Sequence, residues 1–124
     1  MPTSERMLFR GIDLSGFGGF TYITTNRPDG VLYVGFTDDL YRRITQHKAK
    51  HYPNAFSAQY NLDKLVYFEL FETAAEAYAR EQQLKAGNRA RKIKLIEGMN
   101  PKWLDLYEVI VDESRGRLCD RSDL

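Results

Sequence analysis

Five residues have the types and the spacing for acid–base and phosphate chemistry. Tyr22 and Tyr33 lie eleven residues apart on two β-prone runs, and Arg43 and His47 follow shortly after them. Because Arg43 and His47 are four residues apart, they face the same side of a helix. A phenol or an imidazole can exchange a proton, and an arginine can hold two phosphate oxygens. Glu81 adds a carboxylate further along the chain.

Whether the two phenols share a face of the sheet depends on the register of a hairpin. The β-prone runs flank an Asp-Gly pair at 29–30, which is a strong hairpin signal. A loop with an even number of residues, either 29–30 or 27–30, places Tyr22 and Tyr33 on the same face, whereas an odd loop separates them. We expect an even loop.

A later helix is predicted to bury a carboxylate. The sequence Thr-Ala-Ala-Glu at 73–76 forms a capping box that begins this helix, and Gly87 ends it. The position that completes the apolar stripe of this helix is occupied by Glu81. Because an unpaired buried carboxylate is costly, Glu81 should meet a cation such as Arg43, hydrogen bonds or a metal ion. The ion pair and the metal site both stay open.

The remaining pattern predicts an α/β domain with a small, mainly antiparallel three-stranded sheet flanked by helices. Thr37 is the expected N-cap of the first helix. The apolar run 65–71 indicates a strand covered on both faces, and hence the centre of the sheet. Segment 49–61 has the pattern of a loop, and Asn100 that of an N-cap. The expected helices span residues 38–48, 74–86, 89–97 and 101–110.

Size and charge limit the class of protein. A chain of 124 residues, 43% hydrophobic, suits one globular domain. The net charge of +1 conceals a basic middle, because residues 41–102 carry twelve Lys and Arg against six Asp and Glu. This middle favours a phosphate-bearing partner, although a solvated face without a partner stays open. A single cysteine, Cys119, favours the reducing cytoplasm, and we see no export signal or membrane-spanning run.

Together these residues resemble the core of the GIY-YIG nuclease family. The first triplet is degenerate, since Phe20-Thr21-Tyr22 keeps only its tyrosine, whereas Tyr33-Val34-Gly35 departs from the second only by valine for isoleucine. Arg80-Glu81 matches the Arg-Glu context of a metal-binding glutamate in small stand-alone members of bacterial type. Segment 92–107 is similar to their closing segment, so the resemblance covers residues 20–110.

The resemblance implies a Mg²⁺- or Mn²⁺-dependent endonuclease that cuts DNA phosphodiester bonds, with both tyrosines around the attacking water. Tyr33 is the expected base and Tyr22 the positioning residue. Arg43 is the expected phosphate clamp because its planar fork stays charged, and His47 should hydrogen-bond Tyr22 or relay a proton. A lone carboxylate suits a single Mg²⁺ that keeps most of its waters, so Glu81 is the only protein ligand expected.

Other basic residues are expected to contact nucleic acid. They are Arg42, Lys48, Arg89, Arg91 and Lys92. RNA stays open as a substrate. Two rival functions also stay open: a non-catalytic nucleic-acid-binding or adaptor domain of the same fold, and an interaction module that binds no nucleic acid.

The expected domain organisation is a flexible N-terminal extension at 1–19, a nuclease domain at 20–110 and a polar tail at 111–124. Neither flanking segment is long enough to be a separate DNA-binding domain. Specificity is therefore expected from the loop at 49–61, from the glycine-rich leader, or from a partner protein or a second copy of the chain.

Overall fold

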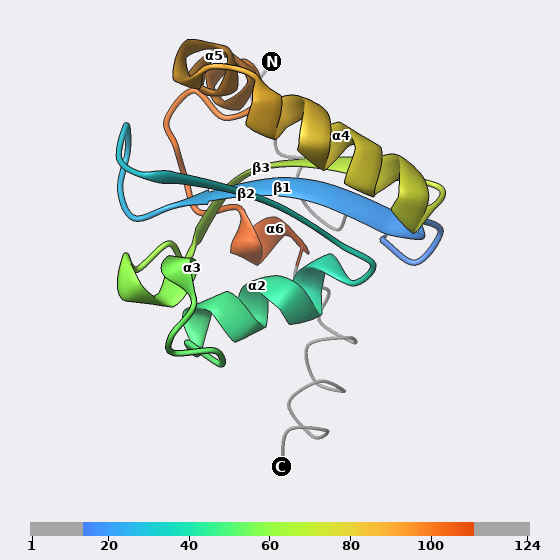
Figure 1. Cartoon of the computed structure of the whole chain (residues 1–124), viewed down its shortest axis with the longest axis horizontal. Helices are drawn as coiled ribbons and strands as arrows, with labels where there is room; N and C mark the ends of the chain where they lie inside the picture. Colours follow the sequence, from blue (N-terminus) through green and yellow to red (C-terminus); the bar gives the residue numbers. More distant parts are fainter. Residues whose placement is uncertain (1–13, 111–124) are drawn as a thin grey trace.

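The computed structural model describes residues 14–110, and an antiparallel sheet of three strands forms its centre. The strands are β1 (Gly19–Thr25), β2 (Leu32–Thr37) and β3 (Lys64–Phe71), in the order β2-β1-β3. The sequence-based expectation of a small antiparallel sheet flanked by helices is confirmed (Figure 1). Predictions about residues 1–13 and 111–124 lie outside the described residues.

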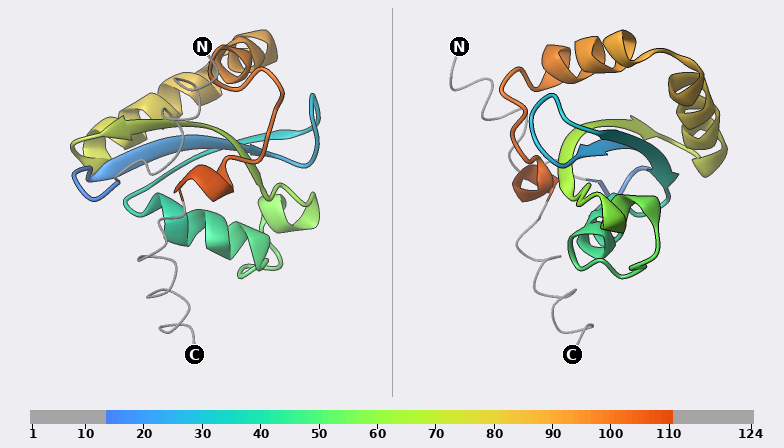
Figure 2. Two further views of the ribbon diagram at one scale, coloured as in Figure 1. Left: turned by 180° about the vertical axis from the view of Figure 1, so that it is seen from behind. Right: turned by 60° about the vertical axis from the view of Figure 1, so that its left-hand side comes forward.

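Helices cover both faces of the sheet. On one face lie α4 (Ala74–Ala86) and α5 (Arg89–Met99), and on the other lie α2 (Leu40–Lys48), α3 (Phe56–Gln59) and α6 (Tyr107–Ile110) (Figures 1 and 2). Two apolar clusters fill the spaces between the layers. Neighbouring β1 residues Tyr22 and Ile23 belong to different clusters, because successive side chains of a strand point to opposite faces.

The hairpin register places the two tyrosines on one face, as the sequence predicts. Thr25 pairs with Leu32, so six residues form the loop, which is longer than either expected length but still even. Tyr22 lies opposite Gly35 and Tyr33 lies opposite Thr24, so the two tyrosines have the same parity.

The helix starts are partly as predicted. The Thr73–Glu76 capping box is confirmed, and the helix expected from residue 89 begins there, with Asn88 as its N-cap. The expectation that Thr37 caps the first helix is wrong, because Asp39 is the N-cap and accepts a hydrogen bond from the backbone amide of Arg42. Thr37 instead accepts one from the Asp39 amide, so it closes a turn just before the helix.

Four other expectations about helices need correction. The segment 49–61 is not all loop, because its residues Phe56–Gln59 form the single turn α3. The final helix begins at Tyr107 and not at 101, and α5 continues past Gly98 to Met99. Asn100 is therefore no N-cap: its amide group donates to the carbonyls of Val66 and Leu104.

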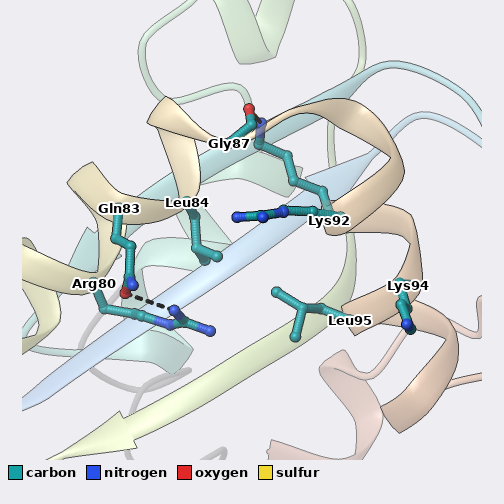
Figure 3. Close-up of a pocket in the computed structure, with 8 residues that line it drawn as sticks. Arg80, Gln83, Leu84, Gly87, Lys92, Lys94 and Leu95 are labelled. Atoms are coloured by element: carbon teal, nitrogen blue, oxygen red, sulfur yellow. Dashed lines mark hydrogen bonds between the residues drawn. The ribbon is translucent and has the colours of Figure 1, made fainter.

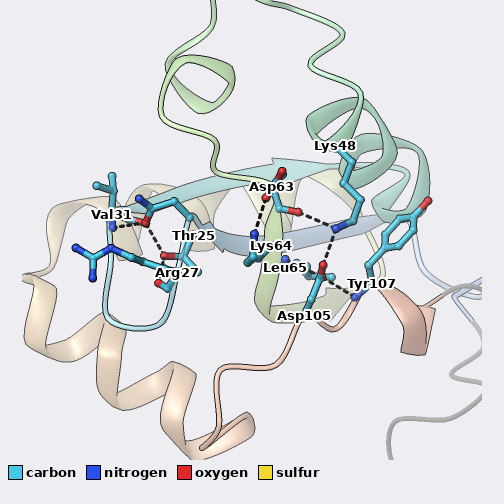
Figure 4. Close-up of polar contacts among 10 residues, drawn as sticks. Thr25, Arg27, Val31, Lys48, Asp63, Lys64, Leu65, Asp105 and Tyr107 are labelled. Carbon is cyan, nitrogen blue, oxygen red and sulfur yellow. Dashed lines mark hydrogen bonds and ion pairs between the residues drawn. The ribbon is translucent and has the colours of Figure 1, made fainter.

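The strand predicted to be central is an edge strand. β1 holds the central position, and β3 is nevertheless buried on both faces over Leu65–Phe68. The segment that leads into α6 covers its outer edge: Leu65 donates its amide to Asp105 and accepts at its carbonyl from the amide of Leu106 (Figure 4). An edge strand sealed in this way can be as apolar as a central one.

Asp105 joins this segment to α2 and β3, and we expect its removal to destabilise the protein. Its carboxylate accepts hydrogen bonds from Lys48 Nζ and from the amides of Leu65 and Tyr107 (Figure 4). Asp105→Ala should lower the free energy of unfolding by about 2 kcal/mol, because it leaves partly buried donors unpaired. Urea denaturation measures the loss. Glu108→Ala, at an exposed position of α6, is the control, and an equal loss there would contradict this role.

Candidate active site

Three side chains from two strands and one helix meet beneath the sheet. The ring centroids of Tyr22 and Tyr33 are 6.3 Å apart, and His47 of α2 lies 5.7 Å from the first and 5.5 Å from the second. Tyr22 and His47 are buried, whereas Tyr33 is partly exposed. The structure thus brings together residues that are up to twenty-five positions apart in the sequence.

A hydrogen bond of 3.0 Å joins Tyr22 Oη to His47 Nε2. Burial lowers the pKa of His47 to about 4, and the nearby positive charge of Arg43 acts in the same direction. Burial also raises the pKa of Tyr22 above its ordinary value near 10, although Arg43 opposes the shift. Both groups are therefore neutral at neutral pH, so the phenol donates and the imidazole nitrogen accepts.

Gly35 makes room for the Tyr22 phenol. A Cβ atom at this position would lie 2.5 Å from Tyr22 Oη and 2.6 Å from its Cζ. Because Gly35 is directly opposite Tyr22 in the hairpin, the ring leans across β2 toward the edge of the sheet. The absence of a side chain at Gly35 is therefore a packing requirement of the phenol.

Arg43 lies one helical turn before His47, as the sequence predicts. Its guanidinium donates to Gln46 Oε1 at 3.3 Å, and its central carbon lies 5.7 Å from the ring centroid of Tyr52. Arg43, His47 and Tyr52 line one shallow depression. Arg43 also borders a groove of about 410 Å³ at the start of α2, which Arg42 lines as well. A cation therefore stands at the mouth of the site.

Glu81 occupies the buried position that the helical pattern predicts, with 6% of its surface exposed. Its carboxylate pairs with Lys85 Nζ at 2.9 Å and accepts from Gln82 Nε2 at 2.7 Å. The alternative of an ion pair with Arg43 is therefore wrong, and Lys85 is the partner. Glu81 contributes to the raised pKa of Tyr22, which places its charge within electrostatic reach of the phenol.

The Glu81 carboxylate suits a hard cation. The Lys85 side chain is 49% exposed, so the ammonium group can leave the carboxylate for solvent when a dication replaces it. Over residues 14–110 no group of three or more His, Cys, Asp or Glu could enclose a metal ion. A single-carboxylate site, with water as the other ligands, is the arrangement that these residues fit.

The basic residues expected to bind nucleic acid do not form one surface. Arg89 donates to the backbone carbonyls of Asp29 and Gly30 and so holds the hairpin loop, while Lys48 pairs with Asp105. These contacts leave Arg89 and Lys48 in structural roles. Arg42 lies near the site, in the groove that Arg43 borders.

Two more of these basic residues, Arg91 and Lys92, lie away from the tyrosines. They line a groove of about 350 Å³ between α4 and α5 (Figure 3). Arg80, in the same groove, is held by both carboxylate oxygens of Glu69 and by Gln83. The two neighbours Arg80 and Glu81 therefore have different surroundings on α4.

Sequence reasoning missed one residue at the site, Tyr52. It lies in an aperiodic segment, and only tertiary structure brings it beside Arg43. The signal that could have found it is the run of aromatic residues between polar ones after the first predicted helix.

Comparison with known proteins identifies the family. The model of the GIY-YIG catalytic domain matches residues 18–94, which is more than half of the chain. The chain belongs to the GIY-YIG family. The three-stranded antiparallel sheet flanked by helices is consistent with the GIY-YIG fold, and the packed part of the domain begins before β1, since Leu14 lies in the core.

The matched stretch makes up a larger share of the curated relatives than of this chain. A UPF0213 protein of Staphylococcus saprophyticus is 39% identical over 72 residues, which cover 55% of this chain and 82% of the relative. UPF0213 proteins of Clostridium perfringens and Haloquadratum walsbyi are 38% and 36% identical, with 60% and 56% of this chain and 78% and 76% of the relatives covered. No solved structure matched. Within residues 14–110, the helices are too short or too polar to cross a bilayer.

The close approach at Gly35 predicts the effect of one methyl group. Gly35→Ala should push the Tyr22 phenol away from His47 and lower the free energy of unfolding by about 1–3 kcal/mol, because the added carbon overpacks a filled site. Thermal or urea unfolding measures the loss. Gly98→Ala is the matched control: nothing would lie within 4 Å of a Cβ added at this position, and the change within a helix should stabilise the protein slightly.

The lowered pKa of His47 predicts a pH dependence of stability. An imidazole with a pKa of about 4 in the folded protein and 6.5 in the unfolded chain gives stability that is complete above pH 6.5. That stability is lost as the pH falls toward 4, by about 2 kcal/mol after allowance for solvent screening.

Unfolding curves of the wild type and of His47→Gln between pH 7 and pH 4 isolate this contribution, and His51→Gln, at an exposed position, is the control. The difference between wild type and His47→Gln should shrink as the pH falls. A constant difference would contradict the lowered pKa.

Proposed function

We propose that this GIY-YIG protein is a Mg²⁺-dependent endonuclease that hydrolyses DNA phosphodiester bonds. The observation that carries the proposal is the pairing of two phenols with different surroundings. The Tyr22 hydroxyl is hydrogen-bonded to His47 and buried, whereas that of Tyr33, in the same cluster, is partly exposed. Hydrolysis needs a general base that takes a proton from water and a positioning residue that holds this base in place.

Tyr33 is the proposed base. Its hydroxyl makes no hydrogen bond to any residue from 14 to 110, so it is available to a water molecule beside the scissile phosphate. Tyr22 is the proposed positioning residue, because burial and the acceptor nitrogen of His47 keep its proton in place. A phenol whose proton is engaged with His47 keeps a fixed position beside Tyr33, but it cannot deprotonate water.

Arg43 and Glu81 are proposed to manage the charge. The Arg43 guanidinium, at the mouth of the site, can donate to two oxygens of the phosphate. Mg²⁺ at Glu81 would offset the charge that develops on the phosphate, and Mn²⁺ has the same ligand preference. Lys85, whose side chain is 49% exposed, would then turn to solvent, and it neutralises the buried carboxylate when no dication is bound.

Loss of single functional groups tests the proposal. Glu81→Gln and Tyr33→Phe should each lower the rate of Mg²⁺-dependent nicking of supercoiled plasmid by about a hundredfold or more, because each removes one group that acts in the transition state. Glu72→Gln, an exposed carboxylate close in sequence to α4, should cleave at the wild-type rate. Cleavage that survives Glu81→Gln, or that needs no divalent ion, would contradict the assigned roles.

The rival function is nucleic-acid binding without cleavage. The basic groove between α4 and α5, which Arg91 and Lys94 line, favours it as much as it favours an enzyme. Binding that weakens steeply with salt, combined with no cleavage at any Mg²⁺ concentration, would select the binding module. No binding even at low salt would leave only a protein-interaction module.

A further inference from the structure

The segment between α2 and β3 exposes aromatic rings to solvent. Tyr52 is 54% exposed, and Phe56 and Tyr60 are each 50% exposed. Phe56 and Tyr60 lie on the same side of the turn α3, with ring centroids 4.6 Å apart. We call these three residues the aromatic ledge. Three large rings are left half in water within nine residues, and packing inside the domain does not explain their exposure.

The aromatic ledge adjoins the candidate active site. The Tyr52 ring lies 5.7 Å from the guanidinium carbon of Arg43 and 4.7 Å from the ring of His51. The depression that Tyr52 helps to line also includes His47, whose Nε2 contacts the Tyr22 phenol. A ligand that places a phosphate at Arg43 therefore reaches the ledge with its neighbouring groups.

The chemistry of the depression favours a ligand that is both anionic and aromatic. Its basic lining residues are Arg43, His47, Lys50 and His51, and no carboxylate lines it. A positively charged groove with aromatic faces beside it is the arrangement that binds single-stranded nucleic acid, because every base has a face that stacks.

We propose that the aromatic ledge stacks unpaired bases next to the scissile phosphate, so that the preferred substrate is single-stranded DNA or RNA, or a single-stranded segment within a larger molecule. Bases of an intact duplex are already stacked on one another and cannot use the ledge. The inference rests on the proposed function for the phosphate that Arg43 holds. It adds the class of substrate.

Fluorescence anisotropy in the presence of EDTA separates binding from cleavage. The probes are a labelled single-stranded DNA without self-complementarity, the RNA of the same sequence, and the blunt DNA duplex. We expect at least one single strand to bind about tenfold more tightly than the duplex. Tyr52→Ala and Phe56→Ala should each weaken single-strand binding by about fivefold to a hundredfold, the range measured for loss of one stacked base, and leave duplex binding unchanged.

Leu104→Ala provides the control for loss of exposed apolar surface. Leu104 is 60% exposed and lies outside the ledge, in the segment before α6, so this variant should bind the single strand like the wild type. Circular dichroism and thermal unfolding show that each variant is folded. Because the ledge residues are exposed, neither measurement should change.

Equal affinity for single strand and duplex would overturn the inference, and so would Tyr52→Ala and Phe56→Ala variants that bind like the wild type. Cleavage with Mg²⁺ is measured separately on the same single strands and the same duplex. Tighter binding of single strands without any cleavage would contradict the proposed function but support the role of the ledge in binding unpaired bases. Cleavage of duplex and single strand at equal rates would support the proposed function but contradict that role of the ledge.

Discussion

The hydrogen bond between Tyr22 and His47 joins the central strand to α2, and the arrangement of the site depends on it. Burial acts on the two partners in opposite directions, since it raises the pKa of the phenol and lowers that of the imidazole, and in both cases it favours the neutral form. A neutral donor and a neutral acceptor can share a buried bond without the cost of a buried charge. The charged groups, Arg43 and the Glu81–Lys85 pair, lie around this neutral pair.

The two edges of the sheet have different roles. The segment around Asp105 covers the outer edge of β3 with hydrogen bonds, so that edge is structural. β2, at the opposite edge, pairs only with β1 within the described residues, and there Gly35 allows the phenol of Tyr22 to lean across the strand. The glycine at position 35 thus determines where the Tyr22 hydroxyl lies, because a single added carbon would occupy the same space.

Positive charge in the sequence is a poor guide to which cations are free to bind a ligand. Arg89 donates a hydrogen bond to the hairpin loop and Lys48 donates one to Asp105. Arg80 donates to Glu69. Arg43 keeps a weaker internal contact and lies beside the tyrosine cluster and the Tyr52 ring. The electrostatics of the site therefore come from a few cations that the fold leaves without a carboxylate, and not from the basic middle of the chain as a whole.

Local patterns in the sequence determined the hairpin, the capping box at Thr73 and the burial of Glu81. They did so because hydrophobic period, turn residues and caps act within a few positions of each other. Only the tertiary structure decided that β3 is an edge strand, that Asn100 binds β3 and is not an N-cap, and that Tyr52 stands beside Arg43. Each of these depends on which surface a side chain meets after the layers have packed, and the residues on one element do not specify the neighbour that will cover them.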